Sequence, residues 1–203
     1  FNPTPAYEIA SCLVGSEMCI RDSARTITSS LSDIHGAITG AIASLKGPLH
    51  GGANEEVMHM MNKIKKPENA LNWINNALDK KTVVMGFGHR VYKSGDSRVP
   101  TMREYFGKVA KITKDKKFEK IYDIVEKVMI DKKNIHPNVD YPTGPTYHLM
   151  GFDTDFFTPI FVISRITGWS AHIIEQHSTN KLIRPLAAYN GSQHRQVQSL
   201  KDR

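Results

Sequence analysis

Residues 27–52 read ITSSLSDIHGAITGAIASLKGPLHGG, and this stretch does most to decide the fold class. Its apolar residues recur at steps of three and four, which is the spacing of one face of an α-helix; they are Ile27, Leu31, Ile34, Ile38, Ile42 and Leu45. Gly47 and Pro48 then supply a stop signal. We predict one helix over 26–45, with alanines and glycines that let another backbone come close.

Helical periodicity continues through most of the chain. Further helices are expected over 54–64, 67–78, 101–112, 117–130, 154–167 and 170–176. A short apolar run, 82–85, precedes a glycine-rich turn, and the prolines of 134–146 predict a loop. The polar tail from Asn190 is expected to be an extended arm. The fold class predicted is all-α.

The composition limits the classes of function. No apolar run approaches the ~20 residues needed to span a bilayer, so no membrane association is expected. The formal net charge of +7 could indicate a nucleic-acid partner. However, the lysines alternate with acidic and apolar residues, as is typical of solvated helix faces, and a basic surface also suits a polyanionic ligand. Cys12 and Cys19 match no zinc or redox motif, and a reducing cytoplasm is the expected compartment.

The first 23 residues differ from the rest of the chain. They begin with Phe1, lack a clean periodicity, and over 12–23 resemble translated adaptor sequence. We interpret 1–23 as a junction that does not belong to the domain.

Two glycine-framed segments carry histidines. His50 stands in GPLHGG, just before the helix expected from residue 54, and a ring beside a helix N-terminus is favoured in its neutral form. His89 follows GFG, which is too short for a dinucleotide fingerprint. His89 and Arg98 could converge on a small carboxylate, to which arginine supplies bidentate hydrogen bonds. Each segment, taken alone, is also typical of an ordinary turn.

A third segment, HPNVDYPTG, holds Asp140 between Pro137 and Pro142. An aspartate in such a place is typical of a helix cap or a turn, and a rigidly held carboxylate base is the alternative. The other histidines lack the spacing of a metal site, and no metal is expected. We interpret them as helix-face or core side chains: His35, His59, His136, His148, His172, His177 and His194.

Taken together and in this order, GPLHGGANEEV, MGFGHRVYKSGDSR and HPNVDYPTG resemble the citrate synthase family. The similarity continues through FTPIFVISRITGW and KLIRPLAAYNG and covers about residues 24–192. These motifs resemble most the bacterial branch, which makes 2-methylcitrate as well as citrate. The resemblance implies an enzyme that condenses acetyl-CoA with oxaloacetate, or propionyl-CoA in the alternative, with no permanently bound cofactor. One methylene is worth only ~1–3 kcal/mol in a pocket, and no residue decides between these donors.

The resemblance also implies roles for the matching residues. Asp140 would remove the α-proton of the acyl-CoA, and because its pKa of about 4 makes it a weak base, His50 would stabilise the enol oxygen by a hydrogen bond. His89 would polarise the carbonyl of oxaloacetate. The residues expected to bind oxaloacetate are His50, His89, Arg98, Arg165 and, from the partner subunit, Arg184. Those expected to face coenzyme A are Gly86, Phe87, Gly88, Lys93 and Lys133.

A two-lobed helical homodimer is implied as well. Residues 24–50 and 157–203 would be parts of the large lobe and 51–156 the small lobe, and their closure would exclude water from the enol intermediate. The family has a further helical region, with another oxaloacetate-contacting histidine, ahead of GPLHGG. No such histidine precedes His35 here, so we expect an incomplete large lobe and a chain that is inactive alone.

The sequence leaves alternatives open for the cellular compartment and for the class of function. A bacterial-type enzyme would be cytoplasmic, and a mitochondrial matrix location stays open because the natural start is expected to be missing. A non-catalytic basic helical module is the distant alternative. It predicts salt-sensitive binding of nucleic acid, and it leaves the ordered set of His50, His89 and Asp140 unexplained.

Overall fold

The structure, a computed structural model, describes residues 18–89, 95–186, 188, 190–191 and 198–201. The helices of this described part confirm the all-α class, and none of them is long and apolar enough to cross a membrane. They are α2 (Met18–Ser29), α3 (Ile34–Leu45), α4 (Ala53–Ile64), α5 (Pro67–Asp79), α6 (Val99–Thr113), α7 (Lys117–Lys133), α8 (Asp140–Leu149), the short 3₁₀ helix η1 (Thr154–Phe156) and α9 (Phe157–Ser178). The helices expected over 54–64, 67–78, 101–112 and 117–130 are confirmed.

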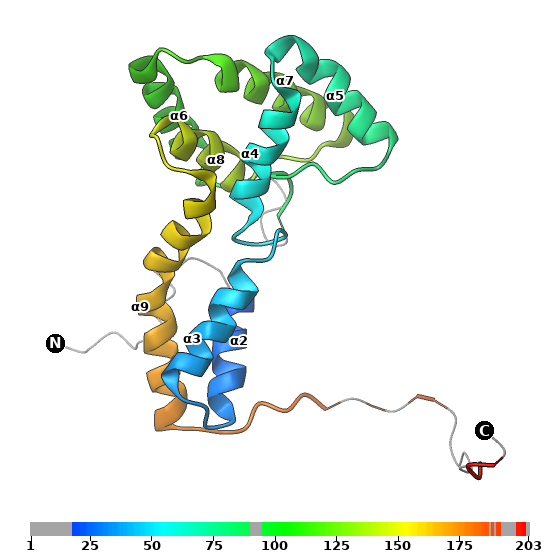
Figure 1. Ribbon diagram of the computed structural model, residues 1–203, viewed down its shortest axis with the longest axis vertical. Helices are drawn as coiled ribbons and strands as arrows, with labels where there is room; N and C mark the ends of the chain where they lie inside the picture. The colour runs from blue at the N-terminus through cyan, green and yellow to red at the C-terminus, as the bar shows by residue number, and fades with distance from the viewer. Residues whose placement is uncertain (1–17, 90–94, 187, 189, 192–197, 202–203) are drawn as a thin grey trace.

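Two separate hydrophobic cores divide these helices. Helices α4 to α8 surround one core, whose fully buried side chains include Met58, Ile74 and Ile121. Helices α2, α3 and α9 surround the other, around Leu45 and Trp169. Figure 1 shows the first group at one end of the molecule and the second at the other, with α9 running from one to the other. The fold is therefore two-lobed.

The single helix predicted over 26–45 is wrong. The chain turns after Ser29, and α3 starts afresh at Ile34 as the antiparallel neighbour of α2. Local polar groups end one helix and begin the next: the backbone N–H of Leu31 donates to the Thr28 carbonyl at 2.8 Å, and Asp33 Oδ1 accepts the Gly36 N–H at 2.8 Å. Asp33 is thus a side-chain N-cap, a signal that the continuous apolar stripe concealed.

The loop predicted over 134–146 is also wrong, because α8 begins at Asp140. Pro142 lies in the first turn, where a missing N–H costs little, but Pro145 lies inside the helix. The hydroxyls of Thr143 and Thr146 each donate to the carbonyl four residues earlier at 2.6 Å. Helix α8 packs against α4 and α6 with most of its first two turns buried, and this burial outweighs the weak helix propensity of its prolines and glycine.

Helix α9 is longer, and α2 starts earlier, than the sequence suggested. The two helices expected over 154–167 and 170–176 are η1 followed by one continuous α9, because Gly168 and Trp169 are buried together inside it. Helix α2 begins at Met18, so part of the stretch interpreted as a foreign junction continues into the bundle. After Ser178 the described residues form no helix. Asn180 and Ile183 form hydrogen bonds with Ser29 at the end of α2, and the chain then extends away from the bundle (Figure 1).

Candidate active site

Backbone hydrogen bonds join the loop that carries His89 to the loop that leads to Asp140. The N–H of Gly88 donates to the His136 carbonyl, and the N–H of Asn138 donates to the Gly86 carbonyl, both at 2.9 Å. The Asn138 side-chain amide also donates to the Gly88 carbonyl at 2.9 Å. These three bonds place the two loops side by side although about fifty residues separate them.

Packing accounts for the glycine-rich turn before His89. Gly86 has a φ of 84°, which favours glycine, and a Cβ there would come within 2.8 Å of the Tyr141 side chain and 2.9 Å of Val57 Cγ2. The Phe87 ring contacts the Tyr141 ring at a centroid distance of 4.4 Å. Gly88 has a φ of 78° with more open surroundings. The role of Gly86, Phe87 and Gly88 toward coenzyme A stays a prediction.

Of the lysines expected to face coenzyme A, Lys133 is exposed at the last residue of α7. Lys93 lies outside the described residues. The contact of either lysine with a ligand stays a prediction.

Asp140 is the first residue of α8, with a half-buried side chain. The N-cap position belongs to Val139 instead, so Asp140 is not the capping residue that one interpretation of the sequence suggested. The N–H of Asp140 donates to Asn138 Oδ1 at 3.1 Å, and the N–H of Tyr141 donates to the Asn138 carbonyl at 3.1 Å. Asn138 therefore fixes the backbone at Asp140 through hydrogen bonds to the N–H groups of Asp140 and Tyr141.

A buried carboxylate, Asp96, links Arg98 to the same helix start. Arg98 Nε donates to Asp96 Oδ1 at 2.9 Å and Arg98 Nη2 donates to Asp96 Oδ2 at 2.8 Å. The N–H of Val139 donates to Oδ2 at 3.2 Å. Burial by itself raises the pKa of Asp96, but the hydrogen bonds from the Arg98 side chain and backbone, its charge, and the bond from Val139 bring that pKa below its usual value.

The other residues expected to bind substrate lie on different elements. His50 is half-buried in the turn between α3 and α4, where its carbonyl accepts the N–H of Ala53, the first residue of α4. Arg165 is half-buried on α9, and its guanidinium lies 4.7 Å from the Phe161 ring centroid. Arg184 is exposed beyond the end of α9. His50 is thus carried at the junction of the two cores and Arg165 on the helix that spans them.

Tyr147 is a half-buried residue of α8 that sequence reasoning did not single out. Burial raises the pKa of Tyr147 above its usual value; the charge of Arg165 lowers that pKa and the charge of Asp140 raises it to a lesser extent. Its ring packs edge-on against Phe157 at 5.5 Å. Seven residues separate Asp140 from Tyr147, which is two turns of α8. Because the prolines of 134–146 predict a loop, this shared helix face could not be recognised from the sequence.

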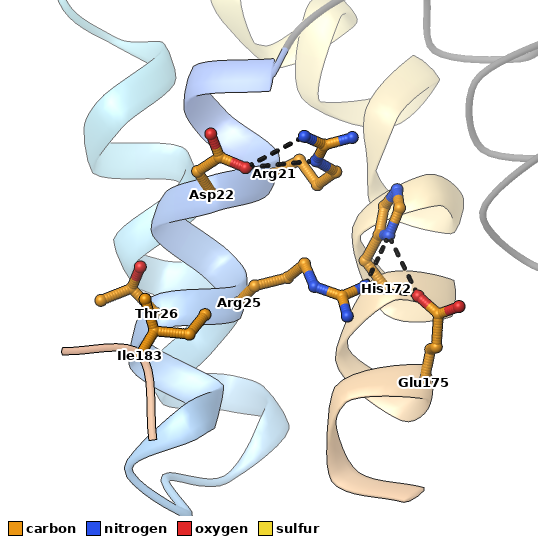
Figure 2. Close-up of a pocket in the computed structure, with 7 residues that line it drawn as sticks. All are labelled: Arg21, Asp22, Arg25, Thr26, His172, Glu175 and Ile183. Atoms are coloured by element: carbon orange, nitrogen blue, oxygen red, sulfur yellow. Dashed lines mark hydrogen bonds and ion pairs between the residues drawn. The ribbon is translucent and has the colours of Figure 1, made fainter. Parts of the chain in front are cut away.

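A cavity of about 510 Å³ lies elsewhere, between α2 and α9. Figure 2 shows Arg25 of α2 pointing toward His172 and Glu175 of α9. Arg25 pairs with Glu175 and also lies 3.2 Å from His172 Nδ1, which must accept because a guanidinium can only donate. Glu175 Oε2 lies 3.7 Å from the same nitrogen. His172 is the satisfied core histidine that the sequence suggested. None of the residues expected to bind substrate lines this cavity.

This two-lobed, all-helical architecture is that of citrate synthases. The chain matches the citrate synthase of Thermoplasma acidophilum, solved as a ternary complex with carboxymethyl coenzyme A and oxaloacetate, with a TM-score of 0.82 and 35% identity, over 98% of this chain and 55% of that one. The chain belongs to the citrate synthase family: residues 22–186 match the family model of the citrate synthase C-terminal domain.

Two curated relatives of similar identity to this chain carry the names of two different enzymes. A 2-methylcitrate synthase of Corynebacterium glutamicum is 56% identical over 181 residues, which are 89% of this chain and 47% of the relative. A citrate synthase of Mycolicibacterium smegmatis is 53% identical over 175 residues, 86% of this chain and 47% of the relative. The chain therefore spans about half the length of the curated relatives it matches.

Proposed function

We propose that the natural polypeptide carrying this chain condenses an acyl-CoA with oxaloacetate, and that acetyl-CoA is the donor and citrate the product. The observation that supports this most is the hydrogen-bonded unit that joins the His89 loop, Arg98 and the start of α8, because it links three segments whose motifs carry residues expected to act on the substrates. The T. acidophilum citrate synthase, solved with oxaloacetate and carboxymethyl coenzyme A, supports the same substrates for this chain.

In the proposed reaction, Asp140 takes the α-proton of the acyl thioester. An unassisted carboxylate is too weak a base for this, since each unit of pKa mismatch costs about 1.36 kcal/mol. His50 donates a hydrogen bond to the thioester oxygen as negative charge develops on it, which stabilises the enol where the charge appears. Helix α8 holds the base and the turn before α4 holds the donor, and these two helices pack together.

The enol carbon then attacks the ketone of oxaloacetate. His89 polarises that ketone by a hydrogen bond to its oxygen, and Arg98 and Arg165 bind the carboxylates. A new carbon–carbon bond forms, and water cleaves the thioester of the adduct to release the tricarboxylate and coenzyme A. Two lobes, 51–156 against 24–50 and 157–203, close over the intermediate and exclude water until condensation is complete.

A homodimer completes the site in this proposal, with Arg184 contributed by the partner subunit. Its exposed position beyond α9 leaves it accessible to a second copy. Co-expression of an Asp140→Asn subunit with an Arg184→Gln subunit tests this. One of the two sites in the mixed dimer would keep both groups, so activity should return, whereas an Arg184 acting in its own subunit would leave the mixture inactive.

Propionyl-CoA is the second candidate donor. It is favoured by the 2-methylcitrate synthase of C. glutamicum, which is slightly more similar to this chain than the citrate synthase of M. smegmatis. Comparison of kcat/KM for acetyl-CoA and propionyl-CoA separates the two. A ratio near one would mean that the pocket does not discriminate between the two donors. Discrimination by one methylene would change the ratio by a factor of about 10 to 200 at most.

The test of the reaction itself is the release of free thiol that depends on both substrates, measured on the whole natural polypeptide. Asp140→Asn should reduce kcat by several orders of magnitude, because it removes the base but keeps the shape. Asp131→Asn, at an exposed position of α7, is the matched control and should keep full activity. Wild-type protein that releases no thiol in the presence of oxaloacetate would refute the proposal.

A further inference from the structure

Asp96 is a buried acid that the proposed reaction does not use. It lies in the short segment between the glycine-rich turn and α6, and its side chain is 1% exposed. Its two oxygens accept four hydrogen bonds: from the backbone N–H, Nε and Nη2 of Arg98, and from the backbone N–H of Val139. A buried carboxylate is tolerated only when it is paired and hydrogen-bonded to this extent.

The pairing fixes how Arg98 can meet a substrate. Asp96 occupies the edge of the guanidinium that carries Nε and Nη2. A substrate carboxylate that binds Arg98 in a bidentate way must therefore use the end of the guanidinium, with Nη1 and the second proton of Nη2. Because the guanidinium is planar and rigid, its contact with Asp96 sets the direction from which the substrate carboxylate approaches.

Asp96 Oδ2 also accepts a hydrogen bond from the backbone next to Asp140, the proposed base. Val139 directly precedes Asp140, and its N–H donates to Asp96 across 43 positions of sequence. One carboxylate thus holds both the arginine expected to bind oxaloacetate and the backbone on which the expected base stands.

We propose that Asp96 is a positioning residue, which orients Arg98 toward a carboxylate of the oxo acid and holds the start of α8, so that Asp140 faces the acyl-CoA beside the bound oxo acid. This inference rests on the proposed condensation. It assigns no chemical step to Asp96, which acts through Arg98 and α8 only.

The test is Asp96→Asn in the whole natural polypeptide. The amide keeps one acceptor oxygen, and its NH₂ group opposes either Arg98 Nη2 and the Val139 N–H or the Arg98 backbone N–H and Nε, so donors face each other in both orientations. The KM for oxaloacetate should rise about tenfold or more, as expected for the loss of a charge-assisted hydrogen bond, while the KM for the acyl-CoA changes less than about twofold. Asp96→Glu, which keeps the charge but adds a methylene, should recover part of the loss.

The matched control is Asp123→Asn. Asp123 on α7 also pairs with an arginine, Arg103, at 2.8 Å, but neither residue of this pair is assigned a role toward a substrate. If Asp96→Asn does not fold, Asp96→Glu alone must show the selective rise in the KM for oxaloacetate. Wild-type protein without oxaloacetate-dependent thiol release would refute the proposed function and this inference with it. An active wild type with Asp96→Asn kinetics equal to those of Asp123→Asn, or with both KM values raised equally, would overturn the inference alone.

Discussion

At Gly144, α8 lies close to α4, and the replacement of this glycine by alanine tests whether the close approach contributes to the stability of the first core. A Cβ at Gly144 would lie 2.8 Å from the backbone carbonyl oxygen of Asn54, 3.3 Å from Val57 Cγ1 and 3.4 Å from Met58 Cγ. A distance below 3.0 Å to a backbone atom cannot be relieved by a side-chain rotation. One of the two helices has to move.

Two opposing effects determine how much Gly144→Ala changes the free energy of unfolding. Alanine within a helix is favoured over glycine by roughly 0.5–1 kcal/mol, whereas overpacking of a core costs typically about 1–3 kcal/mol. Gly107, in the middle of α6, isolates the first effect, because a Cβ there would lie 3.4 Å from Glu119 Oε1 and 3.6 Å from Arg103 Nη1, both ends of flexible side chains. Gly107→Ala should stabilise the protein, and Gly144→Ala should be less stable than Gly107→Ala by about 1–3 kcal/mol.

The assay is urea unfolding of both variants and the wild type, followed by far-UV circular dichroism, with kcat measured on the same samples. The shift of α8 should also lower kcat for Gly144→Ala, because Asp140 stands one turn before this glycine. Gly107→Ala should keep its kcat. A free energy of unfolding for Gly144→Ala equal to or above that of Gly107→Ala would refute the close helix contact as the reason for this glycine.

Two further predictions concern buried polar groups. Tyr141→Phe removes the hydrogen bond that the Tyr141 hydroxyl donates to the Tyr122 carbonyl at 3.1 Å; unfolding should become easier by about 1 kcal/mol, and an unchanged urea midpoint would contradict this. Burial, and then the charge of Arg25, lowers the pKa of His172, so the unfolded chain binds the proton more readily. Stability is then full above the unfolded pKa of about 6.5 and is lost as the pH falls below it. Urea midpoints of the wild type should fall between about pH 7.5 and 5.5 more steeply than those of His172→Gln, and parallel slopes would exclude this role.

Local patterns explain which helices the sequence could predict. Helices α4 to α7 have regular apolar spacing and end at residues that do not continue a helix, so their approximate bounds follow from short-range preferences. The break between α2 and α3 was missed because the apolar stripe runs through it and only the cap formed by Asp33 marks it. Helix α8 was missed because its prolines argue for a loop, and only contacts with α4 and α6 outweigh that preference.

The sequence by itself determined the family, the all-helical class and the side chains that carry the proposed chemistry, His50, His89 and Asp140. These follow from residue types in ordered motifs and from periodicity, which are properties of neighbouring residues. Only the folded chain shows that Asp96 joins Arg98 to Val139 and that hydrogen bonds join the His89 loop to the loop before Asp140. Both depend on the packing of segments far apart in the chain, because burial and hydrogen-bond partners arise only when separate helices are brought together.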